Sequence, residues 1–192
     1  MYQNFEEWKA NFAELDGRMA EDLSICIEGI EQENHPEFWR RAFVRTFFAG
    51  LESDIFQLKQ LVLLKYEANQ CQTLSLGELT MLQELKFSVT DKGEIRESAG
   101  NFVKLLDNLQ FAFKTFAKLN GREFSIDKSD QGWDAMQKAV KIRNGIVHPK
   151  KWESIMITDG PMKTVLKAKN WYAQERAKVM ATHDPSSDKT SG

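Results

Sequence analysis

The chain has 192 residues, of which 42% are hydrophobic and 28% are charged, and its formal net charge is −2. This length suffices for one domain with a sizeable core, and the composition is that of an ordinary globular protein. A net charge this small excludes binding of nucleic acid through a basic field that covers the whole surface. Any such contact therefore requires a local patch of cations.

The two cysteines, Cys26 and Cys71, have neither the paired spacing nor the neighbouring histidines of a zinc site. We therefore expect no metal, no cofactor and a reduced, cytoplasmic protein. The N-terminal stretch, residues 1–8, is polar and acidic and lacks the basic start and apolar run of a signal peptide. No stretch of about 18 uninterrupted apolar residues is present, so no membrane span is expected.

A first helix is predicted from Phe5 to about Glu31, because apolar residues recur there at steps of three and four. They are Phe5, Trp8, Phe12, Leu15, Met19, Leu23, Cys26 and Ile30. Cys26 is expected to be a small core residue on this stripe. Asp16-Gly17 is expected to divide the helix into two pieces.

A second and longer helix is predicted from Pro36, which suits a first helical turn, to about Glu67. His35, just before it, is expected to be a cap or surface residue. The seam with steps of four and three consists of Val44, Phe48, Leu51, Ile55, Leu58 and Val62. Neighbouring apolar residues widen this face, which favours a central helix or an additional dimer interface. Arg41, Arg45 and Glu52 lie on one flank as solvated or ion-paired residues, and Glu52 is placed to approach the site described below.

The middle of the chain alternates capping signals and helical patterns. Ser75-Leu-Gly-Glu78 has the form of a capping box and begins a short helix to about Leu85. Residues 87–98 alternate around Asp91-Lys92-Gly93, which predicts a small hairpin or an irregular loop. Asn101 to Leu119 is again helical, with its phenylalanines assigned to the core, and Asn120-Gly121 provides the C-cap.

The helix that begins at Ser129-Asp130 carries an unexpected charge on its apolar face. Trp133, Met136, Val140 and Val147 follow steps of three, four and seven, and Arg143 occupies the missing position in the last step. A charge on a buried face is costly unless it is paired or lines a cavity. This position therefore predicts a partner or a functional site.

His148 follows Arg143 with four residues between them. On a regular helix the two side chains would diverge by about 140°. Gly145 weakens the last turn and Pro149 disfavours the helical conformation of His148, so we expect the chain end to swing the imidazole back toward the guanidinium.

The pattern Arg-Asn-x-x-x-His-Pro, at the end of a helix in an all-helical chain, resembles the signature of the HEPN superfamily. That signature is an arginine, four to six residues and then a histidine, often with a polar residue after the arginine. Here the match is Arg143, Asn144 and His148. The resemblance implies a helical bundle that is usually dimeric and, in many members, a metal-independent ribonuclease with a composite cleft at the dimer interface.

These residue types suit the cleavage of RNA by its own 2′-hydroxyl. Histidine suits general acid–base work because its ordinary pKa is about 6.5. Arginine stays protonated and its planar fork binds phosphate. Asn144 would orient the imidazole, the phosphate or the helix end. The two other histidines, His35 and His183, are expected to have structural or no roles.

The surrounding charges admit a second interpretation. Between residues 138 and 151 every charged residue is a cation: Lys138, Lys141, Arg143, Lys150 and Lys151. This is a candidate RNA patch, or a cationic helix end that complements the helix dipole. Likewise, Arg143 can pair with an acidic residue of a neighbouring helix while His148 caps carbonyls before Pro149.

The sequence therefore predicts an all-α, HEPN-like bundle of about five or six helices, with a single domain over residues 1–182. A last helix begins at Thr158 or Asp159, and residues 183–192 form a disordered tail. The functional hypothesis is a HEPN-type endoribonuclease, of the toxin–antitoxin or phage-defence kind, with Arg143, Asn144 and His148 as its catalytic residues. Its expected partners are RNA, a second copy of the chain and an antitoxin or regulatory protein. The alternative is a non-catalytic helical module that binds RNA or a partner protein.

Overall fold

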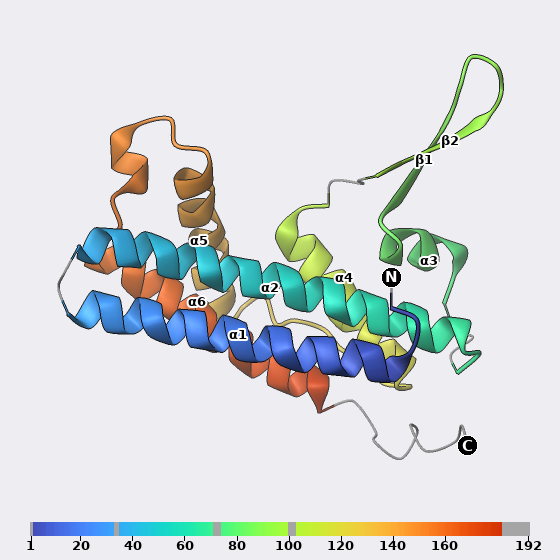
Figure 1. Cartoon of the computed structure of the whole chain (residues 1–192), viewed down its shortest axis with the longest axis horizontal. Helices are drawn as coiled ribbons and strands as arrows, with labels where there is room; N and C mark the ends of the chain where they lie inside the picture. The colour runs from blue at the N-terminus through green and yellow to red at the C-terminus, as the bar shows by residue number, and fades with distance from the viewer. Residues whose placement is uncertain (1, 33–34, 71–73, 100–102, 182–192) are drawn as a thin grey trace. The chain divides into compact units, whose positions relative to one another are not determined.

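The computed structural model describes residues 2–32, 35–70, 74–99 and 103–181. Within these ranges the chain forms six α-helices, one 3-10 helix (η1) and one two-stranded hairpin (Figure 1). Their bounds are α1 (Phe5–Glu31), α2 (Pro36–Glu67), α3 (Leu76–Leu82), β1 (Leu85–Val89), β2 (Ile95–Ala99), α4 (Leu105–Leu119), α5 (Gln131–Val147), η1 (Trp152–Ile155) and α6 (Asp159–Met180). The predicted all-α class is confirmed.

The chain divides into two compact units. One, here called the motif unit, comprises Phe12–Ser53 and Ile126–Ala181. The described residues of the other, the hairpin unit, are 2–11, 54–70, 74–99 and 103–125. Both α1 and α2 contribute residues to each unit. The single domain over residues 1–182 stays a prediction, and the predicted tail, residues 183–192, lies outside the described residues.

Helix α1 is continuous, so the predicted break at Asp16-Gly17 is wrong. The apolar stripe continues on both sides of Gly17, and its burial outweighs the cost of about 1 kcal/mol of one helical glycine. Cys26 is buried on this stripe as expected. Burial raises the pKa of its thiol above the ordinary value.

Within the motif unit, α1 and α2 pack closely at Gly29. A methyl group added there would lie 2.3 Å from the ring of Trp39. Gly50 of α2 also faces α1, but a methyl group there would meet Met19 only at ordinary contact distance. The two helices are drawn side by side in Figure 1. The absence of a side chain at Gly29 therefore leaves room for the Trp39 ring to pack against α1.

We expect Gly29→Ala to lower the free energy of unfolding by about 1–3 kcal/mol, because the new methyl group displaces the Trp39 ring. Gly17→Ala, on the same helix but with open space around it, is the matched control and should raise stability by up to about 1 kcal/mol. Urea unfolding followed by circular dichroism measures both. Equal effects of the two substitutions would contradict the packing at Gly29.

Helix α2 is buried over a wide face. All six residues of its predicted seam are buried, as are Phe43, Phe47 and Leu61. The burial extends to a cation in the hairpin unit: the side chain of Lys59 is 1% exposed. Its Nζ lies 2.9 Å from Oε1 of Glu84 and 5.8 Å from the ring centre of Phe111. This pairing offsets the cost of burying the ammonium group.

The hairpin unit confirms the small hairpin expected near residues 87–98. Strands β1 and β2 are antiparallel, with Leu85 opposite Ala99 and Val89 opposite Ile95. The turn is closed by the amide of Thr90, which donates to the carbonyl of Glu94. Helix α4 begins at Leu105 after the N-cap Lys104, later than expected. The expected start, Asn101, lies outside the described residues.

Helix α4 buries the phenylalanines Phe113 and Phe116, as expected for a core helix. Phe113 meets Phe124 edge to face, with 5.7 Å between the ring centres. Asn120 is the C-cap, and Gly121 follows in a left-handed conformation with φ +67°. The predicted C-cap is therefore confirmed.

The capping box of α3 is present as predicted. The Ser75 hydroxyl accepts a hydrogen bond from the amide of Glu78, and the Glu78 carboxylate accepts one from the amide of Ser75. The same carboxylate pairs with Lys118 of α4 at 2.9 Å. Hydrogen bonds from Ser75, and then from Lys118, lower the pKa of Glu78 from 4.5 to about 2.

Glu78→Gln should therefore lower the stability of the hairpin unit at pH 7, by about 1–2 kcal/mol. In wild type, the contribution of the Glu78 carboxylate to stability is fully present above pH 4.5, the ordinary pKa of a glutamate. It is lost as the pH falls toward 2, the pKa in the folded protein. The stability difference between wild type and variant should shrink over that window. Exposed Glu123, substituted by Gln, is the control. A difference that does not change between pH 7 and pH 2 would contradict the role of the carboxylate.

In the motif unit, α5 packs against α6 through aromatic residues. Trp133 and Trp171 are both buried and lie edge to face, with 5.8 Å between ring centres. Tyr172 of α6 contacts Phe47 of α2 in the same manner, at 6.2 Å. No helix in the described ranges combines the length and apolar character needed to span a bilayer.

Candidate functional site

Helix α5 carries the Arg143–His148 motif at its C-terminal end. Asp130 is the N-cap, and its carboxylate accepts a hydrogen bond from the amide of Gly132. Met136, Ala139 and Ile146 are buried, and Arg143 shares their face. Val147, which the pattern assigned to this face, is instead 41% exposed. The prediction for Val147 is wrong because Ile146 fills the core position one residue earlier.

Arg143 has the acidic partner that a charge at this position requires. Its Nη2 lies 2.6 Å from Oε1 of Glu52 on α2. Its Nη1 donates to Oδ1 of Asn144 at 3.2 Å. The side chains are 27% exposed for Arg143 and 46% for Glu52. The ion pair is thus in reach of solvent, and an anion can compete with Glu52 for the guanidinium.

His148 is the C-cap of α5 and is exposed. Its backbone amide donates to the carbonyl of Asn144 at 2.9 Å, and its φ of −125° and ψ of 64° leave the helical region. Helix α5 continues through Gly145 to Val147, and the chain leaves the helical conformation at His148, as expected for the residue before Pro149. Among the described residues, the imidazole makes no hydrogen bond with Arg143. The structure therefore brings Arg143 and Asn144 into contact, while His148 shares their helix end.

Gly145 leaves room for the chain that follows the motif. A methyl group at this position would lie 3.3 Å from the carbonyl oxygen of Ser154, which is tighter than ordinary contact. The glycine thus allows η1 to approach the last turn of α5. The segment that follows the motif can therefore pack against α5, the helix that carries the motif.

The segment after the motif is also held by two arginines of α2. Arg41 Nη1 donates to the carbonyl of Ile155 at 3.4 Å. Arg40 Nη1 donates to the carbonyl of Ile157 at 3.0 Å, and its Nη2 pairs with Asp159 at 2.6 Å. From the sequence, Arg41 is predicted only to be a charge on the flank of α2. Its signal was present, since Arg41, Arg45 and Glu52 were assigned to one flank of α2.

The cationic residues around the motif are exposed: Lys138, Lys141, Lys150 and Lys151. In the part of the chain that the structure describes, none of the four lysines forms an ion pair with a carboxylate. Trp152 follows them and is 68% exposed. The sequence pattern alone predicts no role for Trp152. Its position directly after two lysines was the signal for a surface role.

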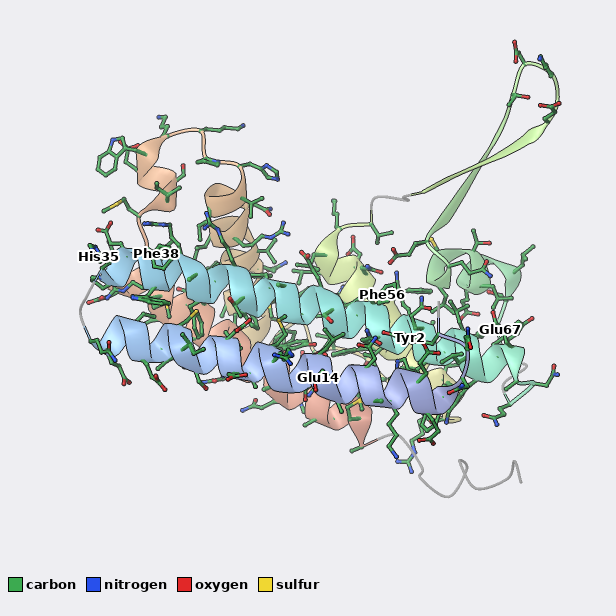
Figure 2. All side chains as sticks on the ribbon, viewed as in Figure 1. Tyr2, Glu14, His35, Phe38, Phe56 and Glu67 are labelled. Carbon is green, nitrogen blue, oxygen red and sulfur yellow. The ribbon has the colours of Figure 1, made fainter. Side chains whose placement is uncertain are left out.

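Other candidate features lie elsewhere. His35 is exposed, and its backbone carbonyl accepts hydrogen bonds from the amides that begin α2, as expected for a cap or surface residue. Figure 2 shows it with Phe38 at the N-terminal end of α2.

No group of three or more His, Cys, Asp or Glu side chains in the described ranges could hold a metal ion. A pocket of about 540 Å³ lies in the hairpin unit, lined in part by Phe5, Glu6 and Lys65, and contains no residue of the motif.

Comparison of the chain with models of protein families, with characterised proteins and with solved structures found no match. The assignment of a function therefore depends on the chemistry of the site and on the resemblance of its motif to the HEPN signature.

Because both members of the Glu52–Arg143 pair are partly exposed, we expect it to contribute less than about 1 kcal/mol to stability. Arg143→Ala and Glu52→Gln should each leave the urea unfolding midpoint nearly unchanged. Met136→Ala, in the buried face of the same helix, is the reference for a structural position and should cost about 2–5 kcal/mol. A loss of that size for Arg143→Ala would identify Arg143 as a structural residue.

Proposed function

We propose that the protein is a metal-independent endoribonuclease of HEPN type, with Arg143, Asn144 and His148 at its site. The observation that carries the proposal is the partly exposed guanidinium of Arg143, bonded to Asn144, on a helix end that also exposes His148. Exposed lysines on both sides of the motif supply the local positive charge that an RNA strand requires.

The reaction needs no group from outside the RNA and the protein. The 2′-hydroxyl of one nucleotide attacks the adjacent phosphorus, and the bond to the leaving 5′-oxygen breaks. One proton leaves the 2′-hydroxyl and one is delivered to the 5′-oxygen, which yields a 2′,3′-cyclic phosphate and a 5′-hydroxyl. His148 moves a proton, and Arg143 stabilises the negative charge on the phosphorane-like transition state.

Glu52 and Asn144 hold the guanidinium before substrate enters. A carboxylate and a phosphate bind the same planar fork of arginine, so Glu52 occupies the place that an RNA phosphate would take. When a phosphate replaces it, Asn144 keeps one edge of the fork oriented. Glu52 is thus a positioning residue in this proposal.

A homodimer would complete the site. One histidine cannot serve as base and acid at the same moment, whereas two copies of His148 across a two-fold interface can divide these tasks. In its biological setting the protein would act as a toxin or phage-defence component, and an antitoxin or regulatory protein would control the exposed motif.

The decisive experiment is cleavage of single-stranded RNA and tRNA in EDTA by wild type, His148→Ala and Arg143→Ala. We expect wild type to cleave and each variant to lose at least about 100-fold in rate. His35→Asn is the matched control, because it removes an exposed histidine and asparagine tolerates the positive φ of this position. Its rate should equal that of wild type.

Equal cleavage by all four proteins would contradict the proposal and point to a contaminating nuclease. Loss of wild-type cleavage in EDTA, with recovery on addition of Mg²⁺, would contradict the metal-independent mechanism.

A second function is favoured by the Glu52–Arg143 pair itself, since a guanidinium that already has an ionic partner suits a non-catalytic module that binds RNA or a protein. RNA binding by wild type without cleavage of any strand would support that function.

A further inference from the structure

Trp152 is exposed to a degree that the fold does not explain. Its exposed fraction of 68% exceeds the 52% of Phe38 and the 44% of Phe56. An indole in water forgoes the free energy of burial, about 25 cal/mol for each Å² of apolar surface. A tryptophan on the surface of a fold is therefore a candidate for contact with a ligand.

The indole is mounted on a short element with several attachments. The 3-10 helix η1 begins at Trp152, and the amide of Ser154 donates to the carbonyl of Lys151 at 3.1 Å. At the other end of η1, the carbonyl of Ile155 accepts a hydrogen bond from Arg41 of α2. Gly145 allows Ser154 to approach α5 closely. The backbone that carries Trp152 is thus attached to both helices of the site.

The neighbouring charges decide what the indole would contact. Lys150 and Lys151 precede it, the acidic Glu153 follows it, and His148 is four residues away; all four are exposed. An apolar protein surface that covered Trp152 would have to remove water from both lysines, which is costly without anionic partners. A nucleic-acid strand offers a flat base for the indole and phosphates for the lysines.

We propose that Trp152 is a base-stacking platform for single-stranded RNA, with Lys150 and Lys151 contacting the flanking phosphates. This inference rests on the proposed function, because it places the bound strand beside His148. It adds a binding determinant that the Arg143–His148 motif does not contain. Stacking on an indole is tolerant of sequence, since every base has a flat face, so the platform would hold the strand without selecting a base.

The test uses a single-stranded 2′-O-methyl RNA that carries 2-aminopurine and cannot be cleaved by its own 2′-oxygen. Binding and fluorescence quenching are measured with wild type, Trp152→Ala, Trp152→Phe and Phe38→Ala. We expect Trp152→Ala to weaken binding about 5- to 100-fold and to abolish most of the quenching. Trp152→Phe should retain part of both, and Phe38→Ala, which removes another exposed aromatic ring, should change neither.

The lysines give an independent readout. In the Lys150→Gln, Lys151→Gln double variant, the slope of log affinity against log salt should fall by about 1.4, because two phosphate contacts are lost. Quenching by Trp152 at saturation should persist in this variant. A slope equal to that of wild type would overturn the lysine part of the proposal.

Failure of this inference is distinguishable from failure of the proposed function. Unchanged affinity and quenching in Trp152→Ala, with cleavage still dependent on His148, would overturn the platform and leave the nuclease. Loss of quenching in Trp152→Ala, with no cleavage by wild type, would leave the platform and remove the nuclease. If Trp152→Ala differs from wild type in molar mass by light scattering but not in RNA affinity, Trp152 belongs to a protein interface. If wild type does not bind RNA, the platform is overturned.

Discussion

The candidate site depends on the charged side chains that α2 directs at the C-terminal end of α5 and the chain beyond it. Glu52 pairs with Arg143, and Arg40 and Arg41 bind the segment from Ile155 to Asp159. These contacts require one register of α2, and that register is fixed by its apolar seam, whose members Val44, Phe48 and Leu51 are buried in the same unit. Hydrophobic burial thus sets the position of the polar groups, which individually contribute little to stability.

The partial exposure of the Glu52–Arg143 pair decides what the pair can do. In a dry interior, separating the two charges would cost several kcal/mol, at least about 3. At a partly solvated site the same guanidinium can exchange one anionic partner for another at low cost, and its bond to Asn144 limits its rotation. An ion pair of this kind is compatible with a phosphate site that is occupied by a carboxylate of the protein until RNA arrives.

Much of the fold was predictable from local signals, and the misses have physical reasons. The Ser75–Glu78 capping box and Asp130 mark helix starts by accepting hydrogen bonds from unpaired backbone amides of the first turn. Pro36 marks another start because its fixed φ suits the first turn and it has no N–H to leave unpaired. A break at Gly17 is the local expectation, but burial of the apolar stripe on both sides of it outweighs the cost of the glycine, and α1 is continuous. The cost of burying a charge predicts that Arg143 has a partner. The sequence also places Glu52 near the site, and Glu52 is that partner. The hydrogen bonds from Arg41 to Ile155 and from Arg40 to Ile157 were not predictable, because they join segments more than a hundred residues apart.

In the proposed reaction the 2′-hydroxyl of RNA is the nucleophile, and Arg143 and His148 promote its attack without a metal. The most direct measurement is single-turnover cleavage, in EDTA, of an RNA strand and of the same strand with one 2′-deoxy nucleotide at the mapped cleavage position. The account predicts that cleavage at this position stops in the substituted strand, and that the unsubstituted strand yields a 2′,3′-cyclic phosphate and a 5′-hydroxyl. Cleavage of both strands at equal rates, or a 5′-phosphate product, would contradict it.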